Sequence, residues 1–283
     1  RNAAARAAPA IPMQASDQDF ALEHVRLRFR DEGAGQPMAF IHGWTLDLDL
    51  WDPQCEEFRH SMRTVRHDRR GFGLSSGRPS LADDVDDLAA LLDHLGIART
   101  VLVGMSQGAR VALAFALQFP RTVSCIVLDG PPSYTGDPES GADEALPLAQ
   151  YRELVRAGGL DTFRRAWREH PYMQLQSKSA ESAELLARML DRYPGSDLLA
   201  TPTISYRPLD ARALAALRVP VLIVNGQHDV KSRKHAGDQL ARLLPRAERV
   251  LLPDAGHLAN LDNPRAYNET IRRFLERQAL AAA

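Results

Sequence analysis

One pentapeptide constrains this chain more than any other feature: Gly-Met-Ser-Gln-Gly at 104–108. It follows the apolar run Thr100–Met105, which is typical of a buried strand, and it opens Gln107–Phe119, whose apolar residues indicate a helix. A strand that turns directly into a helix needs a tight bend, and glycine on both sides of the serine leaves room for it. The turn lifts the Ser106 hydroxyl clear of the sheet, at the positive end of the helix. The pentapeptide therefore predicts a serine nucleophile, and a glycine-rich turn without chemistry is the alternative.

Segments typical of strands and of helices alternate on both sides of the centre of the chain. Strands are predicted over Val25–Arg30, Pro37–His42, Met62–His67, Thr100–Met105, Val123–Leu128, Val219–Asn225 and Glu248–Leu252. Helices are predicted over Leu50–Phe58, Leu81–Leu95, Gln107–Phe119, Lys234–Leu244 and Asn263–Gln278. Strands that are separated by helices pair in parallel and are covered on both faces. The pattern predicts an α/β fold with a mostly parallel sheet flanked by helices.

The stretch 131–215 interrupts this alternation. It has helical periodicity, no convincing buried strand, and prolines near both of its ends. We expect a helical cap over the sheet here, while residues 20–130 and 216–283 form the core. Residues 1–19 begin with a run rich in Ala, Arg and Pro, and they are predicted to form a flexible tail.

Charge and composition exclude several classes of partner. The chain has 35 basic and 36 acidic residues, so no excess of positive charge calls for a nucleic acid or an anionic membrane. No apolar run approaches the roughly 20 residues of a membrane-spanning helix. The nine histidines lack the spacing of a metal site, and we expect neither a metal nor a cofactor. We expect a cytoplasmic protein; because the first residue is not Met, a periplasmic or secreted protein that has lost a signal peptide is the alternative.

A serine is a weak nucleophile, so it needs a base and a group that orients the base. His257 follows the last predicted strand, and Asp229 follows the strand before it. Both therefore lie at the edge of the sheet where the loops of a parallel sheet build sites. His257 is the candidate base, and Asp229 is the candidate that fixes its tautomer. Asp129, directly after another strand, is the rival for the second role.

Acyl transfer also needs two N–H donors aimed at the negative oxygen that forms on the substrate. The backbone N–H of Gln107, next to the serine, is one candidate, and the N–H of Trp44, after the strand Pro37–His42, is the other. The Trp44 side chain is a candidate wall of the substrate pocket. So are Trp167, Tyr172 and Met173 of the expected cap, although packing in a core is the more common role of such side chains.

Five motifs together resemble those of the α/β-hydrolase superfamily. They are His-Gly-Trp at 42–44, Asp-Arg-Arg-Gly-Phe-Gly-Leu-Ser-Ser at 68–76, the pentapeptide at 104–108, Gly226 with Asp229, and Gly-His at 256–257. The first two are similar to those of small bacterial esterases, cofactor-free perhydrolases and enol-lactone hydrolases. The resemblance implies an α/β-hydrolase fold with a helical cap inserted after the sixth core strand. Many perhydrolase-type esterases have Met where this chain has Gln107, so substrate preference does not carry over.

The resemblance and the candidate triad imply a serine hydrolase that cleaves a small carboxylic ester or lactone through an acyl-enzyme, without a cofactor. Two alternatives stay open. The same triad can serve a C–C bond hydrolase or a lyase acting on a small keto acid. A protein of this fold can also bind a ligand without catalysis, although such a protein has no need of a nucleophile.

Overall fold

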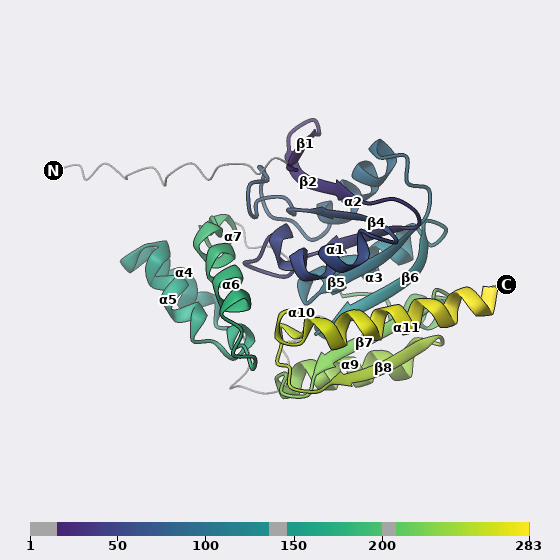
Figure 1. The fold of residues 1–283 in the computed structure, drawn as a ribbon. Helices are drawn as coiled ribbons and strands as arrows, with labels where there is room; N and C mark the ends of the chain where they lie inside the picture. The colour runs from purple at the N-terminus through teal and green to yellow at the C-terminus, as the bar shows by residue number, and fades with distance from the viewer. Residues whose placement is uncertain (1–15, 136–145, 200–207, 283) are drawn as a thin grey trace.

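The computed structural model describes residues 16–135, 146–199 and 208–282, and its centre is one eight-stranded sheet (Figure 1). The strands lie in the order β1-β2-β4-β3-β5-β6-β7-β8. Their bounds are β1 Gln18–Ala21, β2 Arg26–Glu32, β3 Pro37–Ile41, β4 Arg63–His67, β5 Thr100–Met105, β6 Val123–Asp129, β7 Val221–Gly226 and β8 Ala247–Leu252. β2 pairs antiparallel with both β1 and β4, and every other pair is parallel. The mostly parallel sheet predicted from the sequence is confirmed.

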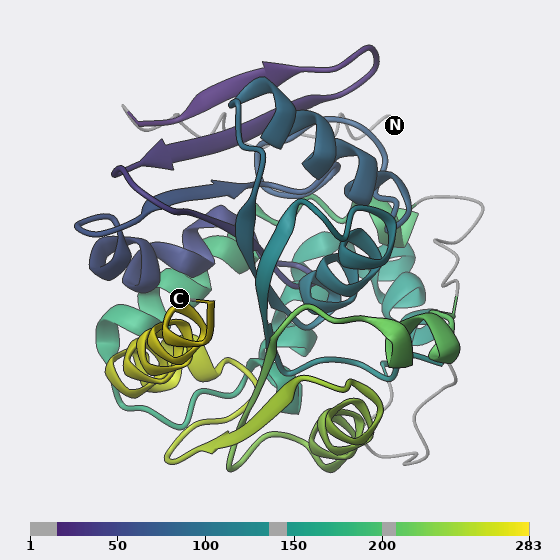
Figure 2. The same cartoon turned by 90° about the vertical axis from the view of Figure 1, so that its right-hand side faces the viewer.

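Helices cover both faces of this sheet, as the turned view in Figure 2 shows. One face carries α1 and α11, and the other carries α2, α3, α8 and α9. Their bounds are α1 Asp52–Phe58, α2 Asp83–His94, α3 Gln107–Gln118, α8 Ala211–Ala216, α9 Lys231–Leu243 and α11 Pro264–Ala282; the four-residue α10, Ala259–Asp262, precedes α11. None of the helices in the described residues is both long enough and apolar enough to cross a membrane.

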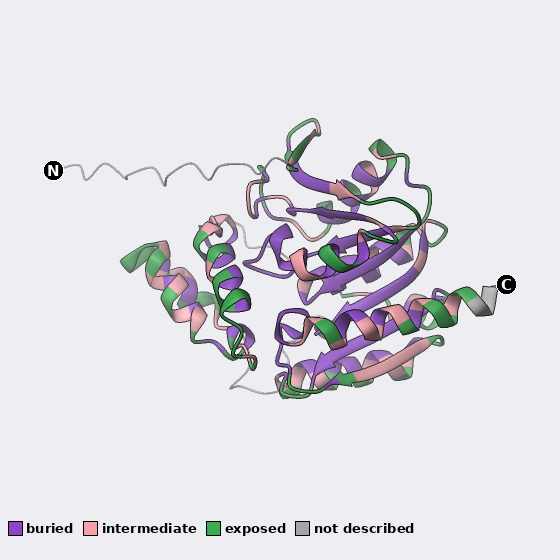
Figure 3. Ribbon diagram, in the orientation of Figure 1, coloured by how far each residue is buried: buried purple, intermediate pink, exposed green. Residues whose placement is uncertain are grey.

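The alternation of side chains along the central strands creates two hydrophobic cores. On β3, Met38 and Phe40 pack under α1 and α11, whereas Ala39 and Ile41 pack under α2 and α3. Consecutive side chains of a strand point to opposite faces, so a strand that is covered on both faces is apolar throughout. Figure 3 shows the result: the central strands are buried along their length, while the outer faces of the helices are exposed.

Residues 146–199, between β6 and β7, form a separate helical layer beside the sheet (Figure 1). Its elements are α4 Leu148–Gly158, α5 Leu160–Arg168, the 3-10 turn η2 Pro171–Met173, α6 Ala180–Arg192 and α7 Ser196–Leu199. Several polar contacts tie the layer to the segment that follows β3. Arg192 pairs with Asp47 and Asp49, and the Trp167 indole N–H donates to the Thr45 hydroxyl over 2.7 Å.

The boundaries of the core differ from those expected at two points. β1 begins at Gln18, inside the stretch 1–19 that was predicted to be a tail, because its backbone pairs with β2 at the edge of the sheet. Residues 1–15 of that stretch lie outside the described residues. Leu214 of α8, placed in the cap by sequence, instead packs in the core beneath α2, α3 and α9, and Tyr134 packs against that same core.

Candidate active site

Ser106 lies at the bend between β5 and α3, in a backbone conformation that side chains seldom adopt. Its φ is 52° and its ψ is −114°. Neither flanking position has room for a side chain. A Cβ at Gly104 would lie 2.4 Å from the carbonyl oxygen of Gly108, and a Cβ at Gly108 would lie 2.1 Å from the carbonyl oxygen of Ile41. Strain of this kind is kept where the surrounding structure enforces it, and it often marks a functional position.

His257 and Asp229 lie together beside this bend. Nδ1 of His257 is 2.9 Å from an Asp229 carboxylate oxygen, and both residues are at most 3% exposed. The carboxylate is held in place by two further donors, the Asn225 side-chain amide at 2.6 Å and the Val230 backbone N–H at 2.8 Å. Burial alone would raise the pKa of Asp229, but His257 and Asn225 together hold it below its usual value. The carboxylate is therefore fixed and ionised beside the ring.

Asp129, the rival of Asp229, ends β6 next to the end of β5. Its side chain is fully buried. Burial and the nearby charge of Asp229 raise the pKa of Asp129 well above its usual value. The His257 ring makes its hydrogen bond to Asp229 instead.

The two residues expected to supply the N–H donors, Gln107 and Trp44, line the same cavity as Ser106. Gln107 is the first residue of α3, so its N–H has no acceptor within the helix. Trp44 follows β3, and its N–H makes none of the hydrogen bonds between described residues. Arg69 connects the two segments, since its guanidinium donates to the Gln107 side chain at 3.0 Å and to the carbonyl oxygen of His42 at 3.4 Å.

His42 has a structural role in this turn. The backbone N–H of Arg69 donates to its Nε2 atom over 2.9 Å, and its Nδ1 atom lies 2.8 Å from the carbonyl oxygen of Gly43. Burial and the charge of Arg69 lower the pKa of His42 well below its usual value, so the ring stays neutral. Both ring nitrogens therefore have a neighbouring backbone partner, which fixes the ring in the turn.

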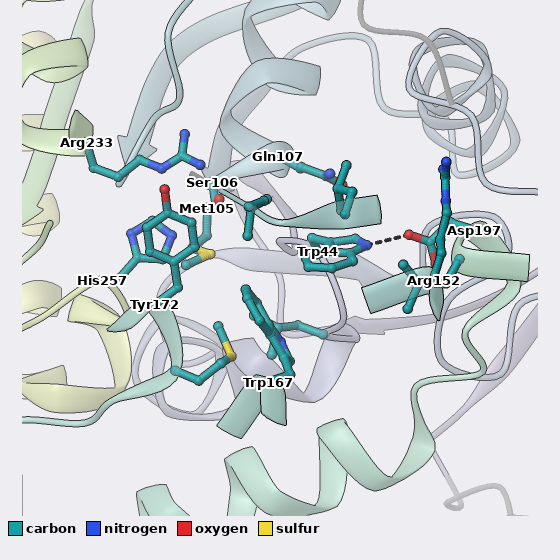
Figure 4. A pocket seen from close by; sticks show the side chains of 15 residues that line it. Trp44, Met105, Ser106, Gln107, Arg152, Trp167, Tyr172, Asp197, Arg233 and His257 are labelled. Carbon is teal, nitrogen blue, oxygen red and sulfur yellow. Dashed lines mark hydrogen bonds between the residues drawn. The ribbon is translucent and has the colours of Figure 1, made fainter. Parts of the chain in front are cut away.

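A cavity of about 770 Å³, measured with its open mouth, connects these residues with the helical layer (Figure 4). Ser106, Gln107 and His257 line its floor, and all four expected wall residues also line it: Trp44, Trp167, Tyr172 and Met173. Tyr151 packs against the rings of Trp44 and Trp167. The walls are mainly apolar, which is typical of a small-molecule site.

Sequence reasoning missed the charged residues of this cavity, Arg152, Asp197 and Arg233. Each lies on a short or amphipathic helix, where a charged residue is ordinarily expected to face solvent. Asp197 accepts hydrogen bonds from the Trp44 indole and the Tyr193 hydroxyl. Asn225 was also missed, although it lies near the end of β7, four residues before Asp229. In the parts of the chain that the structure describes, no group of three or more His, Cys, Asp or Glu residues is arranged to hold a metal ion.

Comparison with known proteins gives consistent matches over most of the chain. Residues 36–264 match the family model described as the alpha/beta hydrolase fold. A pimeloyl-(acyl-carrier protein) methyl ester esterase from Nitrosomonas europaea is 28% identical, over 83% of this chain and 94% of its own. A 2-succinyl-6-hydroxy-2,4-cyclohexadiene-1-carboxylate synthase from Salmonella typhimurium is also 28% identical, over 85% and 96%.

Among solved structures, a thermophilic esterase from Thermogutta terrifontis is similar along nearly its whole length. It is 30% identical, the match covers 93% of this chain and 99% of that one, and the TM-score is 0.77. The architecture therefore agrees with the sequence matches.

Proposed function

The chain belongs to the α/β-hydrolase family, and we propose that it is a serine hydrolase that cleaves a carboxylic ester or a lactone through an acyl-enzyme. The observation that carries the proposal is that His257, paired with the buried Asp229, lines the same cavity as Ser106 on its strained bend. A base, an orienting carboxylate and a nucleophile that lines the cavity are what acyl transfer requires.

In the first half of the reaction, the Ser106 hydroxyl attacks the carbonyl carbon of the substrate. His257 takes the hydroxyl proton at Nε2, and Asp229 stabilises the positive ring through Nδ1. The negative charge that develops on the carbonyl oxygen is received by the N–H groups of Gln107 and Trp44. The proton then passes from His257 to the leaving alcohol, and the acyl group stays on Ser106.

In the second half, a water molecule gives a proton to His257 and attacks the acyl-enzyme. The same two N–H groups receive the charge, and the carboxylic acid leaves as the Ser106 hydroxyl is restored. No step in this cycle needs a cofactor. For a lactone, alcohol and acid are parts of one product molecule.

We further propose that the segment 131–215 acts as the substrate-selecting cap, with its described helices α4–α7 as the working part. Trp167, Tyr172 and Met173 close the cavity opposite the β-sheet. The catalytic residues common to the family belong to the core. We therefore expect the cap residues that cover the cavity to select between substrates.

The test is pre-steady-state hydrolysis of 4-nitrophenyl acetate and butyrate. A burst of nitrophenol equal to the enzyme concentration, followed by a slower steady state, is expected when deacylation limits the rate. Lactone opening is followed in parallel by proton release. A ligand-binding protein without catalysis releases no nitrophenol above the level given by Ser106→Ala, and that result would contradict the proposal.

A second candidate is favoured by one observation, the similarity to the Salmonella synthase. In this alternative, the same triad breaks a C–C bond in a small keto acid, either by hydrolysis or by elimination. Turnover of such keto acids with little or no hydrolysis of esters and lactones would favour it over the esterase.

A further inference from the structure

We propose that Arg233 binds a free carboxylate of the substrate, so that the natural ester or lactone carries a second, anionic group. This inference rests on the proposed function and names the class of substrate for the same cavity. It makes Arg233 a residue that determines specificity in the reaction of Ser106.

Arg233 is a charged residue enclosed in the wall of the cavity. It lies in the first turns of α9 and is 6% exposed, and it lines the cavity together with Ser106 and His257. Its guanidinium carbon is 4.9 Å from the centre of the Tyr172 ring, which in turn lies 4.5 Å from the centre of the His257 ring. Figure 4 shows Arg233 entering above Tyr172 and His257, on the side of Ser106. A permanent cation thus sits one ring away from the proposed base.

The charge of Arg233 acts on other groups at the site. Together with burial and His257, it lowers the pKa of His170 to about 4. A carboxylate on the substrate is attracted by the same charge and a neutral ester is not, so an anionic substrate gains in binding.

The Asp229 carboxylate has a separate role from Arg233. The charge of Arg233 helps to lower the pKa of Asp229, and the two carboxylate oxygens accept from Asn225, Val230 and the ring of His257. Asp229 therefore holds the ring. Arg233 faces the cavity with a planar set of donors that fits a carboxylate in a bidentate geometry.

The remaining charges of the cavity lie at its other end. In Figure 4, Arg152 and Asp197 lie together on the far side of Trp44 from Arg233. Asp197 accepts from the Trp44 indole and the Tyr193 hydroxyl, which stabilises its negative charge there. Between the two ends, the walls are formed by Trp44, Leu46, Met105 and Trp167. The end beside Ser106 is thus positive, and an anion bound there is separated from Asp197 by an apolar region.

The experiment compares, within each pair, an ester that carries a carboxylate with one that carries a methyl group in its place, and the effect of each variant is taken relative to the wild-type protein on the same ester. On the acyl side, 4-nitrophenyl hydrogen glutarate is compared with 4-nitrophenyl valerate, in which a methyl group replaces the carboxylate. On the alcohol side, 4-acetoxybenzoate is compared with 4-methylphenyl acetate. The variants are Arg233→Gln and Arg233→Lys. Arg242→Gln is the matched control, because Arg242 is exposed on the same helix α9 and does not line the cavity.

We expect Arg233→Gln to lower kcat/KM for the anionic ester of one pair by about 10–100-fold, the scale of a lost hydrogen bond between charged groups. The neutral ester of the same pair should change by less than about threefold, and Arg233→Lys should restore part of the loss. Arg242→Gln should leave all four esters unchanged. An equal loss for both esters of each pair would assign Arg233 to the support of the triad and overturn the inference.

A binding measurement separates this inference from the proposed function. In the Ser106→Ala background, calorimetry gives the affinity for all four esters without turnover. If the active enzyme hydrolyses no ester but Arg233→Gln still weakens binding of the anionic ester, the proposed function fails and the carboxylate site stands. If Arg233→Gln leaves the affinity for both anionic esters unchanged, the carboxylate site is contradicted, whether or not esters are hydrolysed.

Discussion

Nδ1 of His257 lies 2.9 Å from a carboxylate oxygen of Asp229, and both groups are shielded from water. Asn225 and Val230 fix the same carboxylate from other directions. The backbone of Gly130 packs closely against the His257 ring: a Cβ on that residue would lie only 2.8 Å from the ring atom Cε1. The ring therefore has little freedom to turn. An imidazole that donates from Nδ1 presents the lone pair of Nε2, which is the atom that must accept the serine proton.

Replacing the two candidate carboxylates should have very different effects. Asp229→Asn keeps the shape of the side chain but offers His257 the wrong hydrogen-bonding partner, so kcat should fall by roughly 10³–10⁴. Asp129→Asn should cost less than about tenfold, because the His257 ring is hydrogen-bonded to Asp229 instead. Steady-state kinetics on a nitrophenyl ester measure both. The reverse order of effects would transfer the orienting role to Asp129.

The strain at Ser106 should be measurable as stability. At a φ of 52° and a ψ of −114°, a side chain costs about 1–3 kcal/mol, which glycine avoids at the expense of a more flexible unfolded chain. We expect the free energy of unfolding of Ser106→Gly to exceed that of Ser106→Ala by about 1 kcal/mol. Urea denaturation of the two inactive variants gives the difference directly. Equal stabilities would mean that the bend is relaxed in solution.

The aromatic residues of the cap should influence different kinetic constants. Trp167 lines the cavity away from the triad, so Trp167→Ala should raise KM for a long or cyclic ester by about 10–200-fold relative to the acetate. Tyr172 stacks on His257, so Tyr172→Ala should lower kcat for both substrates. Trp167→Phe keeps most of the ring and is the control for a general loss of packing. If Trp167→Ala slows both substrates equally, the cap has only a structural role.

A buried carboxyl in α2 should make stability depend on pH. Burial raises the pKa of Asp84 to about 6, against the opposing charge of Arg69. A raised folded pKa means that the folded state holds the proton more tightly, so this stability is complete below about pH 4 and is lost as pH rises through 6. Relative to Asp84→Asn, the wild-type protein should lose on the order of 3 kcal/mol between pH 4 and 7.

Asp93→Asn provides the control for that experiment, since Asp93 is exposed on the same helix. Its stability should follow the wild-type protein across the whole pH range. If Asp84→Asn also follows the wild-type curve, Asp84 is ionised in the folded protein and the expected linkage is absent.

The sequence predicted those parts of the molecule in which local pattern and final structure agree. β5 and α3 are apolar on the faces that the sheet and its neighbours bury, and the glycines beside Ser106 are explained by the space at the bend. Asp229 and His257 could be found because parallel strands end at one edge of the sheet, which brings the loops after β7 and β8 together.

Other features depend on tertiary contacts that no local pattern reveals. β1 is mostly exposed and lacks the alternation of a half-buried strand, so only its pairing with β2 identifies it. Arg233 has the sequence surroundings of a solvent-facing helix residue, and only the fold turns it into the cavity beside Tyr172. The raised pKa of Asp129 likewise follows from burial and from Asp229, which lies far away in sequence.

The central claim is that Ser106 is the nucleophile, and intact-mass spectrometry after treatment with a fluorophosphonate tests it most directly. The account predicts that the wild-type protein gains one phosphonyl group per chain, that peptide mapping places it on Ser106, and that activity is lost in step with labelling. Ser106→Ala should gain no mass under the same conditions. A wild-type protein that stays unlabelled while it hydrolyses esters, or a label on any other residue, would contradict the account.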